Sequence, residues 1–345
     1  MVSLSQMQAP NRIQYPKIDP VAPGAVRPLW SVMIPTYNGV AYLEETLKCV
    51  LAQDLGAELM QIEVIDDCST EGDSEGLVQA IGQGRIQFFR QPRNVGLIGN
   101  WNACIERSQG HWVHILHQDD LVLPGFYQQL QSTLNSPPTL GALFCRHAFI
   151  DEDGHWQGLS KIEQKTPGIL PNWLERIAVV QLIQFPSIVV KRSAYEQLGG
   201  FCADVHYAAD WEMWKRISAH YPVWYEPRIL ACYRIHSASE TSRMIQSGAD
   251  IMDIRKAIEM SKAYLPEASA EQLSQQAKEH YALYALNTAR RLVISHNVQA
   301  AMSQTREALR CSLAISVWRS LFSLLRLMGK QWIGQKILRV NDYEA

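Results

Sequence analysis

Two adjacent carboxylates, Asp119 and Asp120, follow the apolar run 112–116. Neighbouring carboxylates repel each other unless a cation or hydrogen bonds offset their charge. Oxygen ligands of this kind suit Mg²⁺ or Mn²⁺, which keep bound waters and bind substrate phosphates. The pair therefore predicts a divalent-cation site. The alternative is an aspartate-rich turn that caps the helix expected from Pro124.

A second carboxylate pair, Asp66 and Asp67, ends another apolar run, 62–65. Side chains alternate along a strand, so the two carboxylates should point to opposite faces of a sheet. One can cap the following loop while the other accepts an N–H from a nucleobase edge, with Tyr37 stacked on that base. The alternative is that the pair only forms an Asx-turn.

A third acid, Asp210, stands before Trp211 and Trp214 at the start of an expected helix. The unpaired N–H groups of a helix N-terminus stabilise an anion, so this carboxylate would be ready to accept a proton. The alternative is an ordinary acid in the first turn of a helix. The pattern predicts a general base without excluding that second interpretation.

A cation and an imidazole, Arg234 and His236, follow a later apolar run. Arginine suits phosphate oxygens because its planar guanidinium matches their geometry. A single histidine is more often a filler of the surface or core than a ligand. The sequence therefore predicts a phosphate contact for Arg234 and leaves both interpretations of His236 open.

Strand-like and helical patterns alternate in the first half of the chain. Strands are expected at 31–34, 62–65, 86–89 and 112–116, with helical spacing around 43–51, 77–81 and 97–105. Such alternation predicts an α/β fold with a mostly parallel sheet between helices. Ligands of such sheets bind beyond the carboxyl ends of the strands, so the polar residues that follow these strands should meet at one edge.

The second half is less regular. Strands are expected at 142–145, 187–190, 223–225 and 229–233, with a helix opening at Asp210 and helices from about residue 246 to the end.

Composition narrows the class of protein. The chain has 345 residues, 47% of them hydrophobic, and a net charge of −2, which argues against disorder and against a basic field for nucleic acid. Its seven cysteines form no CxxC pair, so we expect a reducing compartment rather than a disulfide or zinc framework. No apolar run is long enough to span a membrane, and residues 1–29 lack the apolar core of a signal peptide. A cytoplasmic location is expected.

In their order along the chain, these motifs resemble those of the family 2 glycosyltransferases, which have the GT-A fold. The resemblance covers about residues 30 to 240. Five elements carry it in order, and a closing element follows them at 233–236. The five are 31–38; 65–70; 94–96 with 110–113; 116–120; and 199–201 with 210–216. Two positions depart from the pattern. Cys68 stands where glycine is usual, and His117 stands where many relatives carry aspartate, which puts the metal geometry in doubt.

The resemblance implies a role for each matching residue. Pro35, Thr36 and Tyr37 would hold the base, and Asp67 would bind the imide if that base is uracil. Asn94 would lie on the nucleotide-sugar side. Asp119 would face the ribose or the metal, Asp120 would bind Mn²⁺ or Mg²⁺, and Asp210 would be the general base. Arg234 and His236 would add positive charge at the diphosphate, with His236 also a candidate metal ligand.

The implied function is inverting transfer of a sugar from a nucleotide sugar, with a UDP-sugar favoured, to a hydroxyl of a glycan or lipid-linked acceptor in surface polysaccharide synthesis. A catalytically weak, sugar-nucleotide-binding or scaffold protein on the same fold is the alternative, suggested by His117. A nucleotidyltransferase is disfavoured because residues 35–39 lack a glycine-rich, basic phosphate loop.

The domain prediction has three parts: a tail at 1–29, a catalytic domain at 30–245 with a nucleotide-binding half (30–125) and an acceptor half (126–245), and a helical region at 246–345.

The segment 310–339 holds six basic residues and no acid. Its apolar residues, Leu321, Phe322, Leu324, Leu325 and Met328, are expected on one side of a helix, and Arg319, Arg326 and Lys330 on the other. Such a helix can contact an anionic membrane. The alternative is packing against the catalytic domain or against a partner chain in a homo-oligomer.

Overall fold

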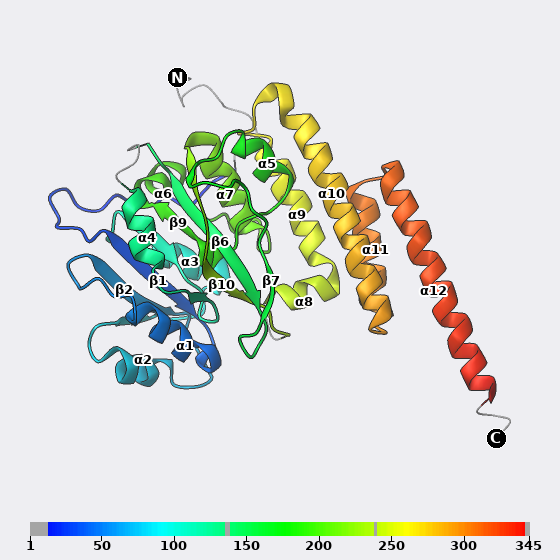
Figure 1. Cartoon of the computed structure of the whole chain (residues 1–345), viewed down its shortest axis with the longest axis horizontal. Helices are drawn as coiled ribbons and strands as arrows, with labels where there is room; N and C mark the ends of the chain where they lie inside the picture. Colours follow the sequence, from blue (N-terminus) through cyan, green and yellow to red (C-terminus); the bar gives the residue numbers. More distant parts are fainter. Residues whose placement is uncertain (1–12, 135–138, 238–239, 342–345) are drawn as a thin grey trace.

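The protein is described by a computed structural model that covers residues 13–134, 139–237 and 240–341, with side chains as far as Gly329. One mixed sheet with helices on both faces forms the body of the molecule, and a group of long helices extends from it (Figure 1). Its strands are β1 (Trp30–Thr36), β2 (Met60–Asp66), β3 (Gln87–Arg90), β4 (Trp112–Ile115), β5 (Leu121–Val122), β6 (Ala142–Ile150), β7 (Trp156–Leu159), β8 (Gly168–Ile169), β9 (Ile188–Lys191) and β10 (Val223–Arg234).

The first four long strands form the parallel half of the sheet in the order β3-β2-β1-β4. Every residue of β1 is buried, as expected for a parallel strand covered on both faces. Val32 and Ile34 belong to one core cluster and Met33 to the other, because side chains alternate between the faces. The predicted parallel arrangement is confirmed for this half of the sheet, whose carboxyl ends meet at one edge.

The rest of the sheet is mixed, in the order β4-β9-β6-β10-β5. Strands β4, β9 and β6 pair antiparallel, whereas β6 and β10 pair parallel. The two strands expected at 223–225 and 229–233 are one strand, β10. Its pairing is irregular between Glu226 and Ile229, where Pro227 supplies no N–H to the ladder. The expected break is therefore an irregularity within one strand.

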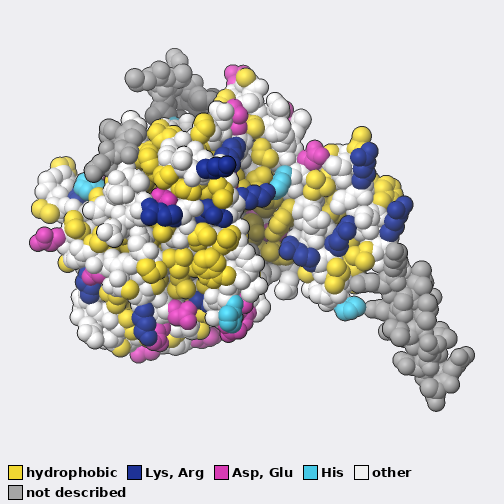
Figure 2. Space-filling model, viewed as in Figure 1, with side chains coloured by type: hydrophobic (Ala, Val, Ile, Leu, Met, Phe, Trp, Pro, Cys, Tyr) yellow, Lys and Arg dark blue, Asp and Glu magenta, His cyan; other side chains and the backbone are white. Residues whose placement is uncertain are grey.

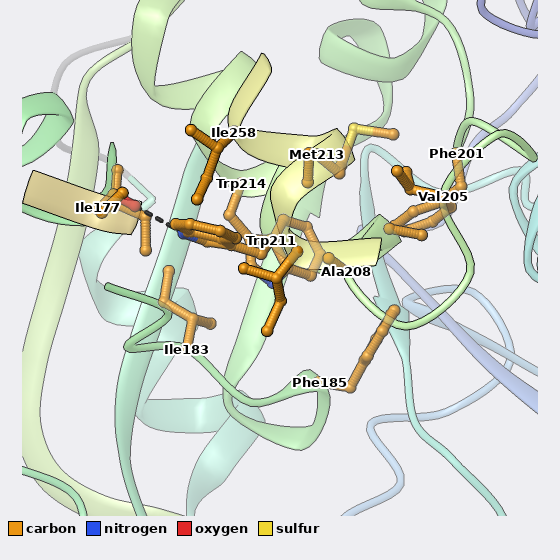
Figure 3. Packing of buried hydrophobic residues seen from close by; sticks show 14 of the residues in the cluster. Ile177, Ile183, Phe185, Phe201, Val205, Ala208, Trp211, Met213, Trp214 and Ile258 are labelled. Carbon is orange, nitrogen blue, oxygen red and sulfur yellow. Dashed lines mark hydrogen bonds between the residues drawn. The ribbon is translucent and has the colours of Figure 1, made fainter. Parts of the chain in front are cut away.

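The helices divide between the two faces. One cluster packs residues of α1 and α4 on the sheet, and the other packs α3, α5, α6, α7 and the later helices on the opposite face. Figure 3 shows the centre of this second cluster, where Trp211 and Trp214 of α7 lie among aliphatic side chains and Phe185. The elements of this part are α1 (Val40–Leu51), α2 (Ser74–Gly82), α3 (Gly96–Arg107), α4 (Phe126–Thr133), α5 (Trp173–Val179), η1 (Phe185–Ser187), α6 (Arg192–Leu198) and α7 (Ala209–His220).

The described residues before β1 lie on the second face of the sheet. Ile18 is 1% exposed in the core cluster that also contains α7. The Tyr15 hydroxyl donates to Glu212 Oε1 at 3.0 Å, and the Arg216 guanidinium lies 3.6 Å from the centre of the Tyr15 ring. This part of the expected tail is thus held by contacts with the domain, whereas residues 1–12 lie outside the described residues.

The chain is helical after β10, as predicted. Helix α10 packs against α5 and α9 on one side and against α11 and α12 on the other, so α12 lies farthest from the sheet (Figure 1). The predicted division at residue 245 falls within α8, and the division into domains stays a prediction. Within the described residues, no helix is long and apolar enough to cross a bilayer. The helices are α8 (Glu240–Ser247), α9 (Ala249–Ser261), α10 (Glu267–Ile294), α11 (Val298–Cys311) and α12 (Ile315–Asn341).

The apolar residues of α12 do not share one environment. Leu321 and Leu324 are buried with Val317, whereas Phe322 and Leu325 are more than half exposed. The apolar arc of the helix is wider than the surface that packs against α10 and α11, because these residues spread over about half a turn at about 100° per residue. Within this apolar side of the helix, one part is packed and another faces outward. Lys330 and the residues after it have no described side chain.

Candidate active site

The loops that follow β1 and β4 are joined by a glutamine. Gln118 Oε1 accepts hydrogen bonds from the Tyr37 backbone N–H at 2.9 Å and from the Thr36 hydroxyl. The Thr46 hydroxyl of α1 is within hydrogen-bond distance of the Gln118 and Asp120 carbonyl oxygens, at 2.8 and 2.9 Å. These contacts fix the Asp119–Asp120 segment to the end of β1, where the predicted contacts with the nucleobase lie. Tyr37 itself is 44% exposed and free to stack on a planar ligand.

The loops after β1 and β2 are also tied together. Asn38 adopts a φ of 49°, and its Oδ1 accepts from the backbone N–H groups of Thr70 and Glu71 at 2.9 and 3.1 Å. Cys68 has a φ of 60°, in the left-handed region that favours glycine. This backbone requirement gives a physical reason for the glycine that is usual at that position.

The Asp66 carboxylate belongs to its own loop. It accepts from the Ser69 backbone N–H at 3.1 Å and from Arg90 Nε at 2.7 Å. The side chain is fully buried by the ion pair and the turn. Asp66 therefore has a structural role in its own loop, as the alternative predicted, although the N–H that it accepts lies three residues on rather than the two of an Asx-turn.

The Asp67 carboxylate lies at the N-terminus of α3. Its two oxygens accept from the backbone N–H groups of Val95 and Gly96, at 2.7 and 2.9 Å. Burial raises the pKa of Asp67 although both N–H groups oppose the shift. Asn94 is exposed in the same turn, and its Oδ1 accepts from Gly96 N at 3.0 Å. The carboxylate is held rigidly at the sheet edge, and its contact with a base stays a prediction.

The Asp119–Asp120 turn gathers a possible set of metal ligands. One atom each of His117, Asp119 and Asp120 lies within 4.8 Å of the others. Asp120 Oδ1 accepts from the Arg234 backbone N–H at 2.9 Å, but Asp120 Oδ2 and His117 Nε2 are buried with no hydrogen-bond partner among the described residues. Two unpartnered buried atoms in one oxygen-and-nitrogen set fit a divalent cation. His117, expected only as a departure, therefore joins the candidate ligands.

Electrostatics at this turn agree with a cation site. Burial, followed by the charge of Asp119, raises the pKa of Asp120 well above its usual value. Burial acts on Asp119 too, but a 2.9 Å hydrogen bond with His236 Nε2 and the nearby His117 hold its pKa below the usual value. Burial lowers the pKa of His117 to about 4, so its imidazole is neutral near pH 7 and can ligate a metal. His236 contacts the cluster through Asp119.

Arg234 has a different environment from the one expected. Its Nε donates to the Asp119 carbonyl oxygen at 2.9 Å, one terminal nitrogen to the Glu152 carbonyl oxygen at 2.9 Å, and the other to Glu45 Oε2 at 2.6 Å. The side chain is 1% exposed, and the guanidinium lies 4.7 Å from the centre of the Tyr42 ring. The guanidinium thus joins two loops and helix α1 instead of facing an open phosphate site.

Asp210 is the second residue of α7. Its Oδ1 accepts from the Trp211 backbone N–H at 2.6 Å and its Oδ2 from Gln181 Nε2 at 2.7 Å. Burial raises the pKa of Asp210 to about 7, although these hydrogen bonds and Lys215 oppose the shift. A carboxylate with a pKa near 7 suits a general base. Gln181 was missed from the sequence because it lies in a loop with no motif.

The charges of Asp210 and of the Asp119–Asp120 turn act on one side chain, Tyr233 of β10. Burial raises the pKa of the Tyr233 hydroxyl, and the charges of Asp120, Asp119 and Asp210 act in the same direction. The three carboxylates therefore influence one hydroxyl, although Asp119 and Tyr233 are 114 positions apart in the sequence.

Aromatic rings connect the same two regions. The His117 ring stacks on Trp101 at a centroid distance of 5.2 Å and lies 4.3 Å from Phe185. Phe185 in turn lies 5.6 Å from Trp214 of α7 (Figure 3). The rings fix the metal turn relative to the helix that carries Asp210.

A surface hollow of about 390 Å³ lies elsewhere, at the C-terminal end of α7. Asn172, Trp173, His220 and Tyr221 are among its lining residues, and none of the predicted site residues lines it. Asp210 lies at the opposite end of α7. The carboxylates and their contacts, rather than this hollow, locate the candidate site.

Two proteins are similar to this chain in sequence. An uncharacterised protein of Mycobacterium tuberculosis, MT1568, is 28% identical over 244 residues, which cover 68% of this chain and 75% of that protein. TuaG of Bacillus subtilis is named as a teichuronic acid biosynthesis glycosyltransferase. It is 36% identical over 96 residues, which cover 27% of this chain and 37% of TuaG.

Solved structures share the fold. TarS 1–349 of S. aureus, in complex with UDP-GlcNAc, has a TM-score of 0.59 and 13% identity over 81% of this chain and 91% of that chain. The mannosyltransferase PcManGT of Pyrobaculum calidifontis, in complex with GDP-Man and Mn²⁺, has a TM-score of 0.57 and 18% identity over 93% of this chain and 84% of that one.

The family model "Glycosyl transferase family 2" matches residues 31–199. This segment runs from β1 through the metal turn to α6, so it includes the carboxyl edge of the parallel strands, while Asp210 and the helices from α7 onward follow it. The mixed sheet, its flanking helices and the helical C-terminal region agree with the GT-A neighbours. Residues 31–199 therefore belong to glycosyltransferase family 2, and the chain has a GT-A fold.

Proposed function

We propose that this family member is an inverting, divalent-cation-dependent glycosyltransferase that uses a nucleoside diphosphate sugar. The observation that carries the proposal is the row of ring contacts from His117 through Phe185 to Trp214, which links the turn of Asp119 and Asp120 to the helix of Asp210; the charges of all three carboxylates also act on Tyr233. A cation-held diphosphate and a general base are the two parts that such a transfer needs at one site.

Asp210 acts on the acceptor. Its carboxylate takes the proton of the acceptor hydroxyl while the hydroxyl oxygen bonds to the anomeric carbon of the sugar. The bond from that carbon to the diphosphate breaks, and its electron pair leaves with the diphosphate. Attack from the face opposite the leaving group inverts the anomeric configuration. His117, Asp119 and Asp120 would hold Mn²⁺ or Mg²⁺, which supplies positive charge for the leaving diphosphate when bound.

The donor class follows from the edge of the sheet and from the neighbours. TarS is described in complex with UDP-GlcNAc and PcManGT with GDP-Man and Mn²⁺, which supports a nucleotide sugar here. The half-exposed Tyr37 ring can stack on the base. Asp67 at the same edge favours a UDP-sugar through the imide of uracil. The name of TuaG supports a glycan acceptor in surface polysaccharide synthesis.

The alternative of a weak, sugar-nucleotide-binding scaffold depended on His117. A buried, neutral imidazole whose Nε2 has no partner among the described residues can replace an oxygen ligand, so this departure does not remove the cation site. The alternative predicts donor binding without transfer, and it is separated from the proposal by measuring sugar transfer or donor hydrolysis with Mn²⁺.

A donor panel tests the proposal. Thermal unfolding is followed with UDP- and GDP-sugars, each with Mn²⁺ and with EDTA. A ligand that binds only the folded chain stabilises it by about 2.7 kcal/mol at a hundred times its Kd, so the correct donor should raise Tm most, and only with the metal. Equal Tm values for all donors with and without Mn²⁺ would contradict a metal-dependent donor site.

We also propose that α12 contacts an anionic membrane, where a lipid-linked acceptor would be found. Trp318, Phe322 and Leu325 are exposed along one line of the helix, with Ile315 73% exposed at its start. The segment 310–339 contains no acid, so a second copy of the helix would offer no opposite charge. Figure 2 shows basic and hydrophobic side chains next to one another over α10 to α12.

Vesicle flotation tests this contact. The Phe322→Ser/Leu325→Ser double variant should float less than the unchanged chain with phosphatidylglycerol vesicles, and neither should float with phosphatidylcholine alone. The matched control is Met302→Ser, an exposed apolar residue of α11. Equal flotation of all variants, or a dimer that dissociates only in the double variant, would contradict membrane binding.

A further inference from the structure

Helix α10 contacts the loop of Gln181, whose side chain holds the candidate general base Asp210. The backbone N–H of Gln181 donates to the Tyr281 hydroxyl at 2.9 Å. The Tyr281 ring is 6% exposed and lies 5.0 Å from the ring of Trp211, the residue after Asp210. Tyr281 follows the family-matching segment 31–199 by more than eighty positions, so the contact belongs to the C-terminal helices of this chain.

The hydrogen bonds of Gln181 fix the direction of its amide. Gln181 Oε1 accepts from the Ile183 backbone N–H at 3.3 Å, which leaves Nε2 to donate to Asp210 Oδ2 at 2.7 Å. Helix α5, which precedes this loop, is held as well: Trp211 Nε1 donates to the Ile177 carbonyl oxygen at 2.6 Å (Figure 3). Tyr281 therefore holds Gln181 itself, and Trp211 holds the helix before it.

We propose that Tyr281 is a positioning residue for the general base: α10 holds the Gln181 backbone, and Gln181 holds the Asp210 carboxylate in the orientation in which it receives the acceptor proton. The proposal depends on the base role of Asp210 given above. It assigns to the C-terminal helices a part in the reaction in addition to any contact with a membrane.

The charge environment of Asp210 determines the sign of the expected effect. The ionisable groups that face it are Lys215 on its own helix, Tyr233 on β10 and Tyr281 on α10. Burial raises the pKa of Asp210 to about 7, and the Gln181 hydrogen bond opposes that shift. Loosening Gln181 should therefore raise the pKa further, so less of the base is ionised at a given pH and the acid limb of the rate profile moves to higher pH.

Four variants separate positioning from simple packing. Tyr281→Phe removes the hydroxyl and keeps the ring on Trp211, and Gln181→Leu removes the amide at similar size. The double variant combines them. The matched control is Tyr284→Phe, which removes a hydroxyl from the same helix; that hydroxyl has no hydrogen bond among the described residues.

The measurement is kcat and kcat/KM against pH from 5 to 9, with saturating metal, and thermal unfolding of each variant. At pH 6, we expect Tyr281→Phe to lower kcat about three- to tenfold, in line with the loss of one hydrogen bond, with the donor KM unchanged. Gln181→Leu should show a larger shift in the same direction. The double variant should match Gln181→Leu alone, because both changes act through one contact.

The outcomes distinguish this inference from the proposed function. A Tyr281→Phe profile that superimposes on the unchanged enzyme overturns the inference, as does an equal shift in Tyr284→Phe. If Tyr281→Phe does not fold, an unshifted profile for Gln181→Leu overturns it instead. Full activity in Asp210→Asn would contradict the proposed function itself. Loss of activity in that variant, with unshifted profiles in the others, would contradict only the role of Tyr281.

Discussion

The candidate site has two sides that are held in different ways: the nucleotide side, with the proposed nucleotide and metal contacts, and the base side, with the proposed general base Asp210. On the nucleotide side, carboxylates and loops at the ends of adjacent parallel strands bind one another: Asp67 accepts backbone N–H groups 28 and 29 positions away, and Gln118 accepts from the end of β1. On the base side, α7 is held by distant parts of the chain. Gln181 and α10 support Asp210, and Tyr15 reaches Glu212 across 197 positions.

This difference has a physical cause. Parallel strands place their carboxyl ends at one edge, and backbone N–H groups there are fixed by the sheet and by α3. Helix α7 lies on the face of the sheet, so its polar residues must be satisfied by buried side chains. Glu212 pairs with Arg216 at 3.0 Å, and Lys215 Nζ donates to the Ala257 carbonyl oxygen at 3.0 Å. The base side therefore depends more on tertiary packing.

Asp210→Asn tests the base side most severely. Asparagine keeps the size of the side chain but cannot take the acceptor proton, so transfer should fall by about 10²–10⁴-fold. Donor affinity with Mn²⁺, measured by calorimetry, should change little because the nucleotide side is separate. Parallel losses of donor affinity and transfer would show that the two sides are not independent.

Ile18→Ala tests whether the segment before β1 supports the base side. Removing a buried isoleucine side chain should lower the free energy of unfolding by about 2–5 kcal/mol, measured in urea. The matched control is Val26→Ala in the same segment, where the side chain is 99% exposed and little change is expected. Similar values for both variants would mean that the segment contributes little to stability.

Asp120→Ala tests the nucleotide side. If Asp120 ligates the metal as proposed, loss of its carboxylate should weaken Mn²⁺-dependent donor binding by at least about tenfold, measured by titration with and without the metal. Asp153→Ala is the matched control, since Asp153 belongs to an exposed group of Asp151, Asp153 and His155. Unchanged donor binding in Asp120→Ala would place the cation elsewhere.

Cys68→Gly should have the smallest effect, because it changes only the local backbone. Glycine removes the Cβ atom that disfavours the φ of 60°, so this variant should be more stable than Cys68→Ala by about 1 kcal/mol in chemical unfolding. Both variants lack the sulfur, which isolates the backbone effect. A more stable alanine variant would argue against strain at this turn.

Much of the nucleotide side could be predicted from the sequence. The alternation of strands and helices predicted that Thr36, Asp67 and Asp120 follow strands of one edge, because parallel strands must end on the same side. The family motifs added the roles of these residues. The irregularity in β10 and the split apolar arc of α12 were not predicted, since each depends on which neighbour the element meets.

The sequence by itself determined the fold class and the motifs, because strand and helix periodicity and short-range spacing are local properties. Only the tertiary structure decided that His117 lies beside Asp119 and Asp120, that Arg234 contacts protein acceptors and that Gln181 hydrogen-bonds Asp210 and Tyr281. These contacts join residues that no spacing relates, and they exist because burial forces each polar group to find a partner wherever the packed chain supplies one.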